Sequence, residues 1–386
     1  MKLGFSIPCS ALALLFLPAC GGDKPAPAPA PNPAPAPAAP SPTPPAAAPV
    51  DASASKTQRE PVPEPVAQNP GKKPMMPVRV NYDLAKVLFG NEPAAPAVDN
   101  PSTPEKVALG KALFLEKSLS KDGSVSCASC HDLANYGQDG KATSTGAGGK
   151  HGERNAPSVY NAARQYKQFW DARADTIEDQ ALMHVLEPEA NGIADEAELV
   201  KKIKEKAELV AGFQKAFPGD ADAVSAKNFK LAMGAFERTL VTKSRFDAYL
   251  DGDQKALSNE EKLGLKIFMG EGPNAATRVA CTQCHMSRLV GGNMLQKLGV
   301  LKPHGTKDTG RERVTKSDAD KFFFKVSPLV NVEKTGPYQH DGKMATLEEA
   351  VANMASVQLD KTLPPEEIAA IIAFLKALTG PLPELK

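Results

Sequence analysis

A set of residues occurs twice in this 386-residue chain with the same internal spacing. Leu109-Gly110, Phe114, Cys127, Cys130 and His131 recur as Leu263-Gly264, Phe268, Cys281, Cys284 and His285, each 154 positions further along the chain. A single recurrence at so long a period is typical of two homologous domains, because solenoid repeats are shorter and more numerous. The duplication therefore predicts one domain at residues 81–250 and a second at residues 251–386.

Helix signals open each repeat, and strand signals are scarce. Ser102 or Thr103 can cap a helix in the first repeat, and Ser258 can cap one in the second. Further helices are predicted at 196–217, 227–250, 346–356 and 365–378. Because regular alternation of polar and apolar residues is nearly absent, we predict an all-α class. The glycine-rich loops at 137–152 and 291–310 are too long to be simple connections, so we expect them to cover something.

Each repeat carries one C-x-x-C-H motif, the pattern to which haem c is attached. Two thiols three positions apart can add to the two vinyl groups, and the adjacent histidine then ligates the iron. The residues are Cys127, Cys130 and His131 in the first repeat, and Cys281, Cys284 and His285 in the second. A thiol redox site or a zinc site is the alternative, and zinc is disfavoured because further Cys or His ligands at matching spacings are missing. We therefore predict two covalently bound haems c.

The first 80 residues are predicted to precede the folded body. In residues 1–19, Lys2 is followed by an apolar run, and the segment ending in Cys20 resembles a bacterial lipobox. The resemblance implies cleavage before Cys20 and lipidation of its thiol, with a plain secretory signal as the alternative. Residues 20–80 are rich in Pro and Ala and predict a disordered, semi-rigid tether, or alternatively a docking segment for a partner. The expected location is periplasmic, anchored by lipid at the outer membrane.

The charges of the chain are balanced. It has 46 Lys and Arg against 45 Asp and Glu, a formal net charge of +1. Proteins that bind nucleic acid normally carry a basic excess, so we expect no nucleic-acid partner. The same balance gives no indication of the charge on a protein that would dock here.

Several short motifs, in this order, resemble the bacterial di-haem cytochrome c peroxidases, together with the related branch that matures methylamine dehydrogenase. Besides the two C-x-x-C-H motifs, they are Arg154–Val159, Gln168–Asp171, Gln180-Ala181 and Pro337 through His340 to Met354. The resemblance implies an enzyme that reduces hydrogen peroxide to water at the first haem. It also implies that the second haem, ligated by His285 and Met354, accepts electrons from a small cytochrome c or cupredoxin.

The resemblance assigns roles to residues between the two motifs. Trp170, the only tryptophan of the chain, corresponds to an electron-transfer bridge between the haems. A large core anchor is the structural alternative for such a residue. Asn155, with the backbone carbonyls of Thr335 and Pro337, corresponds to a calcium site, and oxygen ligands of this kind suit Ca²⁺.

Peroxide reduction also needs a group that moves a proton between the two oxygens. The family uses a glutamate with a nearby glutamine. The glutamine corresponds to Gln180, and the glutamate corresponds to Glu189 after a shift of one residue. Ala190 occupies the strict register, and Glu187 is a rival for the role.

A second departure from the family concerns the sixth ligand of the first iron. Many members close this haem with a loop histidine whose position here is Ala147. His151 lies four residues further along the same loop. If the repeats are aligned at a displacement of 170 positions, His184 falls opposite Met354. His184 could therefore act at the first iron as a ligand or as a distal base, His151 could be the ligand instead, and if neither histidine binds the site is open.

Two other functions stay open at this stage. One is an enzyme that oxidises a protein Trp or Tyr through a high-valent state. Met354 argues against it, since the maturation branch has Tyr at that position. The other is a di-haem cytochrome that only transfers electrons, in which both irons would hold two strong ligands. The sequence does not decide the oligomeric state, and a homodimer is one alternative.

Overall fold

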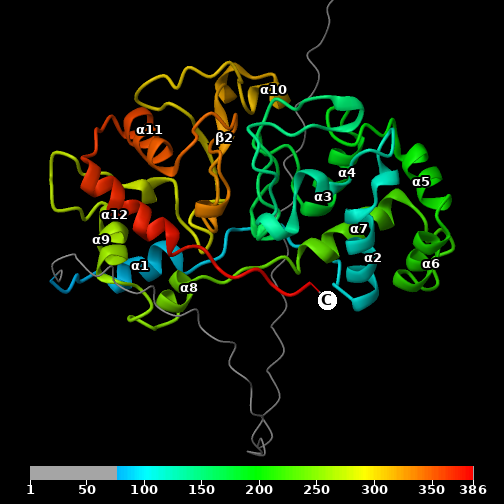
Figure 1. Ribbon diagram of the computed structural model, residues 1–386, viewed down its shortest axis with the longest axis horizontal. Helices are drawn as coiled ribbons and strands as arrows, with labels where there is room; N and C mark the ends of the chain where they lie inside the picture. Colours follow the sequence, from blue (N-terminus) through cyan, green and yellow to red (C-terminus); the bar gives the residue numbers. More distant parts are fainter. Residues whose placement is uncertain (1–75, 386) are drawn as a thin grey trace, which may run out of the picture. The chain divides into compact units, whose positions relative to one another are not determined.

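The computed structural model describes residues 76–385, all within one compact unit. The signal peptide, Cys20 and nearly all of the tether predicted at 20–80 lie outside the described residues. In the described part helices dominate, and the strands β1 (Leu295–Lys297) and β2 (Phe323–Lys325) form one antiparallel pair (Figure 1). The prediction of a helical protein is confirmed in this form, a mainly helical fold with one small sheet. None of the helices in this part is long and apolar enough to cross a membrane.

The first hydrophobic core forms where α2 (Pro104–Leu115) crosses α7 (Ala226–Glu237). Thr103 caps α2, since its side-chain oxygen accepts a hydrogen bond from the Lys106 amide at 3.3 Å. The Phe114 and Phe236 rings meet in this core with their centroids 5.5 Å apart. Three further helices pack around the crossing: α4 (Ile177–Leu186), α5 (Glu196–Lys204) and α6 (Ala207–Ala216).

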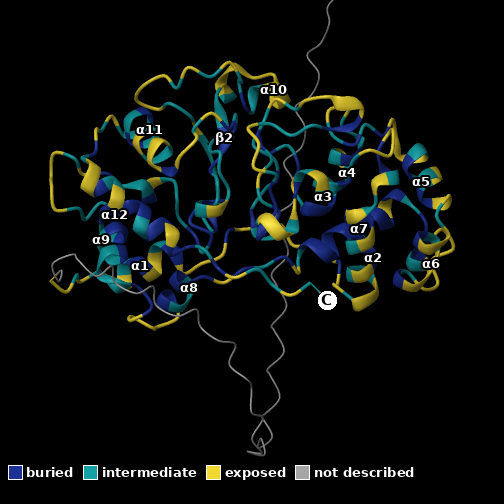
Figure 2. Cartoon of the chain, in the orientation of Figure 1, coloured by how far each residue is buried: buried dark blue, intermediate teal, exposed yellow. Residues whose placement is uncertain are grey.

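The second core forms in the same way, where α9 (Asn259–Phe268) crosses α12 (Pro365–Lys376) beside α11 (Leu347–Leu359). It also contains α1 (Tyr82–Phe89) and α8 (Arg245–Leu250), whose Phe89 and Phe246 rings are 5.3 Å apart. These buried faces are dark blue in Figure 2. The division predicted at residue 250 therefore does not coincide with the limits of the two cores, because α1 and α8 precede residue 251 and bury their aromatic side chains in the second.

Both helix crossings place a glycine at the point of contact. A Cβ atom on Gly110 would overlap the carbonyl oxygen of Ala232, and one on Gly264 would overlap that of Ala370. Only a residue without a side chain lets the helices approach so closely. The duplicated Leu-Gly pair is therefore explained by helix packing.

We expect Gly264→Ala to lower the free energy of unfolding by about 1–3 kcal/mol, the usual cost of overpacking, although Ala favours helix by about 1 kcal/mol over Gly. Denaturant unfolding of the holoprotein measures this change. Gly212→Ala in α6 is the control, because its Cβ would meet only the tip of the Leu109 side chain, at 3.0 Å. Equal stability of the two variants would contradict the packing explanation.

The predicted helices at 196–217 and 227–250 are each interrupted. A turn at residues 205–206 lets α5 and α6 both bury apolar residues in the first core. Residues 238–244 leave the helix because Thr242 accepts hydrogen bonds from the side-chain amides of Asn161 and Asn331, both at 2.9 Å. These two asparagines are 170 positions apart, and both have left-handed backbones, with φ of 60° and 62°. The interruption thus joins equivalent points of the two repeats.

Candidate functional site

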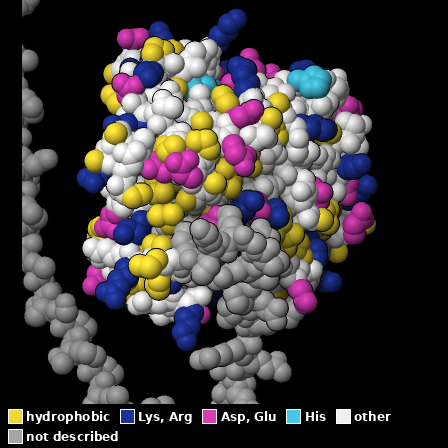
Figure 3. All heavy atoms as spheres, turned by 60° about the vertical axis from the view of Figure 1, so that its left-hand side comes forward, with side chains coloured by type: hydrophobic (Ala, Val, Ile, Leu, Met, Phe, Trp, Pro, Cys, Tyr) yellow, Lys and Arg dark blue, Asp and Glu magenta, His cyan; other side chains and the backbone are white. Residues whose placement is uncertain are grey.

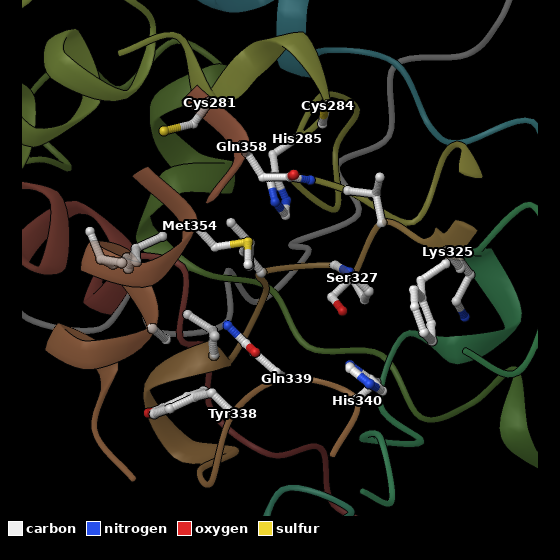
Figure 4. Close-up of a pocket in the computed structure, with 18 of the residues that line it drawn as sticks. Cys281, Cys284, His285, Lys325, Ser327, Tyr338, Gln339, His340, Met354 and Gln358 are labelled. Carbon is white, nitrogen blue, oxygen red and sulfur yellow. The ribbon is translucent and has the colours of Figure 1, made fainter. Parts of the chain in front are cut away.

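A cavity of about 290 Å³ adjoins the second C-x-x-C-H motif, and we call it the second site. Cys281, Cys284, His285 and Met354 line it, and most of the remaining wall is apolar. The His285 ring and the Met354 sulfur both point into this space (Figure 4). The Nδ1 atom of His285 lies 3.2 Å from the carbonyl oxygen of Val290, which leaves Nε2 for a ligand. Burial lowers the pKa of His285 to about 4, so its imidazole is neutral, the form that binds metals.

The first C-x-x-C-H motif forms the short helix α3 (Cys127–Cys130), followed directly by His131. We call His131 and the side chains that face it the first site. His131 is buried, and its Nδ1 atom lies 3.2 Å from the carbonyl oxygen of Gly137. Burial, followed by the charge of His184, lowers the pKa of His131 to about 4. The Nε2 atom of this neutral ring is thus available for a metal, as in the second site.

His184 on α4 faces His131. The two ring centroids are 6.3 Å apart, and the Nδ1 atom of His184 is 3.1 Å from a carboxylate oxygen of Glu187. Metal–nitrogen bonds of about 2 Å on both sides of an iron place two imidazole centroids roughly 6 Å apart. The spacing of the two rings therefore fits a haem iron between them. The displacement of 170 positions suggested this place for His184, and α4 and α11 do both begin directly after a capping threonine.

An ion-pair chain surrounds the end of α4. Arg173 pairs with Glu187 and with Asp171, the latter at 3.0 Å, and its guanidinium lies 3.4 Å from the centroid of the Phe169 ring. Burial opposes a charge on Glu187, but the hydrogen bond from His184 and the charge of Arg173 lower its pKa. Glu187 is therefore a fixed carboxylate at the first site. Gln180 lies one turn before His184 on α4 and is half-buried.

The other predicted residues of the first site lie differently. The side chain of Glu189 is exposed, because α4 ends at Leu186 and the turn that follows directs Glu189 to solvent. Ala147 is buried, and its amide donates to the Ala190 carbonyl at 2.8 Å. His151 is exposed, with its Nδ1 atom 3.4 Å from the Thr145 hydroxyl. The geometry thus favours Glu187 over Glu189 and His184 over His151.

Phe169 and Trp170 connect the two sites. The Phe169 ring is 6.0 Å from the His184 ring, whereas Trp170 lies edge-on to His340 at 6.3 Å and lines the cavity of the second site. The indole N–H of Trp170 donates to the Asn155 carbonyl at 2.9 Å. Consecutive aromatic residues therefore reach from one site to the other.

The residues predicted to bind calcium, Asn155, Thr335 and Pro337, all line the cavity of the second site. The side-chain N–H of Asn155 donates to the Lys141 carbonyl at 2.8 Å, which leaves the side-chain oxygen as the atom that could bind a cation. Across residues 76–385, no group of three or more His, Cys, Asp or Glu side chains could hold a metal ion. A cation here would therefore depend on neutral oxygens, and calcium stays a prediction.

Sequence patterns missed several charged residues near these sites. Arg154 bridges Asp171 and Asp308, both at 2.6 Å, and so ties the first repeat to the long loop of the second. Burial opposes a charge on Asp308, yet the hydrogen bond from Arg154 lowers its pKa to about 2. Lys325 on β2 is buried beside Trp170. No spacing signal links these residues, because their partners are distant in the sequence.

Comparison with known proteins identifies the class of protein that this fold and these sites define. The family model described as di-haem cytochrome c peroxidase matches residues 104–255. The cytochrome c551 peroxidase of Nitrosomonas europaea is 40% identical over 310 residues, covering 79% of this chain and 89% of that protein. Its counterpart from Pseudomonas aeruginosa is 38% identical over 318 residues, covering 79% and 88%.

A solved structure also has a similar fold. The crystal structure of a MauG-like protein associated with microbial copper homeostasis is similar with a TM-score of 0.64 and 28% sequence identity, covering 75% of this chain and 93% of that one. The chain belongs to the di-haem cytochrome c peroxidase family. The family resemblance predicted from the motifs is confirmed, and membership implies haem cofactors.

Proposed function

We propose that this chain is a peroxidase that converts hydrogen peroxide, two electrons and two protons into two molecules of water. The single observation that carries the proposal is the first site, where two imidazoles face each other at 6.3 Å beside the carboxylate of Glu187. The relatives named cytochrome c551 peroxidases support the same reaction. When bound, haem supplies the iron at which the O–O bond is reduced.

The proposal includes two covalent haems, attached through the Cys pairs of the two motifs. His131 would hold the first iron, and His285 with Met354 would hold the second. Trp170 and Phe169 provide an aromatic path for electrons between the sites. The donor is a small periplasmic cytochrome c or cupredoxin, calcium binds at Asn155, Thr335 and Pro337, and a lipid on Cys20 anchors the protein to the outer membrane.

Glu187 is the residue that we propose to move the proton. As a carboxylate, it can accept a proton from one peroxide oxygen and return it to the other, which leaves as water. Its ion pair with Arg173 holds it beside the position of the first iron. His184 closes that position in the resting protein and must move away before peroxide can bind.

A pure electron-transfer cytochrome is the second candidate, because two strong imidazole ligands on the first iron are typical of electron carriers. The two functions separate in a titration of the fully oxidised and half-reduced holoprotein with stoichiometric peroxide, followed by absorption and EPR spectroscopy. We expect reaction only after one-electron reduction has released His184. If peroxide changes neither form, the enzymatic proposal is wrong.

A further inference from the structure

Lys325 is a buried cation that pairs with none of the carboxylates in the described part of the chain. Its exposed fraction is 7%, and it lies on β2 in the wall of the second-site cavity (Figure 4). Its ammonium contacts the side-chain oxygen of Gln165 and, at 3.1 Å, the backbone carbonyl of Lys167. Both partners are neutral. Within residues 76–385 no carboxylate pairs with it, although an ammonium has three N–H donors.

The charged groups around Lys325 do not compensate for its burial. The charge of Asp171 acts on Lys325, but Arg154 and Arg173 pair with that carboxylate at 2.6 and 3.0 Å. Arg311 binds the backbone carbonyls of Asp171 and Ala172 at 2.9 and 2.7 Å and adds another positive charge. Burial lowers the pKa of Lys325 to about 7, against the opposite effect of Asp171. Buried charges in proteins are normally paired, so this environment favours the binding of an anion.

The position of Lys325 indicates what that anion is. Its backbone N–H donates to the Trp170 carbonyl at 2.7 Å, and the ring of its neighbour Phe324 lies 4.4 Å from the His340 ring. Lys325, His340 and Gln165 all line a cavity whose wall is otherwise mainly apolar. A haem has the matching character, since its apolar macrocycle carries two propionate carboxylates at one edge.

We propose that the Lys325 ammonium binds a haem propionate at the end of the cavity near Trp170, and thereby orients that haem and raises its reduction potential. The proposal rests on haem occupancy of the sites, and it does not require peroxidase activity. Reduction removes one positive charge from the haem, so a nearby cation favours the reduced form. The carboxylate could come from either haem, and the potentials of the two haems distinguish these sources.

The test is a spectroelectrochemical titration of Lys325→Gln, Lys325→Met and Lys297→Gln holoproteins. Lys297 lies on the neighbouring strand β1 and is exposed, so its variant removes the same charge at the surface. We expect the midpoint potential of the second haem to fall in both Lys325 variants and to stay at the wild-type value in Lys297→Gln. A fall at the first haem alone would assign the carboxylate to that haem. Unchanged potentials at both haems would overturn the proposal.

Haem content, measured as the pyridine haemochrome, shows whether the variants assemble. If Lys325→Gln and Lys325→Met lose haem, Lys325→Arg decides the question, because it keeps the charge. Binding of a propionate predicts that Lys325→Arg restores both haem content and potential. A Lys325→Arg protein with full haem content and the lowered potential would contradict it. Loss of peroxide reaction in the wild type would refute only the proposed function, because the potentials do not depend on turnover.

Discussion

Replacing Glu187 by Gln is expected to lower the rate of peroxide reduction by about 100- to 10,000-fold, the usual contribution of a positioned acid or base. The amide keeps the size of the side chain and can still accept a hydrogen bond from His184, but it cannot take up a proton. The backbone carbonyl of residue 187 still accepts from the amides of Ala190 and Gly192 at 3.0 and 2.9 Å, so the turn after α4 should keep its fold. Turnover with a reduced cytochrome c donor, corrected for haem content, measures the effect.

Glu189→Gln is the matched control, with the same chemical change two residues away. Because the Glu189 side chain is exposed, we expect its turnover to stay within about twofold of the wild type, as for other surface substitutions. The opposite result, an inactive Glu189 variant and an active Glu187 variant, would restore Glu189, the residue to which the family resemblance points after a shift of one residue. Equal loss in both variants would indicate that neither carboxylate has a specific role.

The direction of the Glu187 side chain could not be predicted from the sequence. The motif Gln180-Ala181 fixes the register along α4, but the helix ends at Leu186. In the turn that follows, the direction of each side chain depends on local backbone angles rather than on helical periodicity. A shift of two residues, from Glu189 to Glu187, is then enough to exchange an exposed carboxylate for one beside His184.

The duplication allowed more of the fold to be predicted than the short motifs did. A recurrence at 154 positions predicted two similar domains, and the structure repeats the crossing of α2 with α7 in that of α9 with α12. The displacement of 170 positions aligned His184 with Met354, and in the structure His184 faces His131, because helices α4 and α11 begin at equivalent residues. Alignment of the two repeats predicts the structure correctly where both repeats form the same local structure.

Contacts between distant segments could not be predicted. Lys325 lies in a three-residue strand of a chain predicted to be all-α, and its partners Gln165 and Lys167 are about 160 positions away. Likewise, α1 and α8 join the second core through aromatic contacts that no local pattern encodes. The roles of such residues cannot be predicted from local patterns, because they depend on contacts that form only when the fold brings distant segments together.

Removal of the His184 imidazole is expected to change the resting state of the first site. In His184→Gly, the first haem should be high-spin and five-coordinate in the oxidised protein, and it should react with peroxide without prior reduction. Peroxide and imidazole compete for one coordination position. If the wild type is open in 1% of molecules or fewer, the apparent rate of peroxide binding rises by about 100-fold or more in the variant. EPR spectra and stopped-flow absorption measure the two effects.

His151→Gly is the control, because His151 is exposed and its ring contacts only Thr145 among the described hydrogen bonds. Its spectra and peroxide reaction should match those of the wild type. A high-spin His151 variant, with an unchanged His184 variant, would mean that the loop rearranges to supply the ligand. If the wild type is already high-spin at rest, neither histidine closes the site. In that case the 6.3 Å spacing of His131 and His184 serves another purpose, with His184 acting beside Glu187 as a distal base.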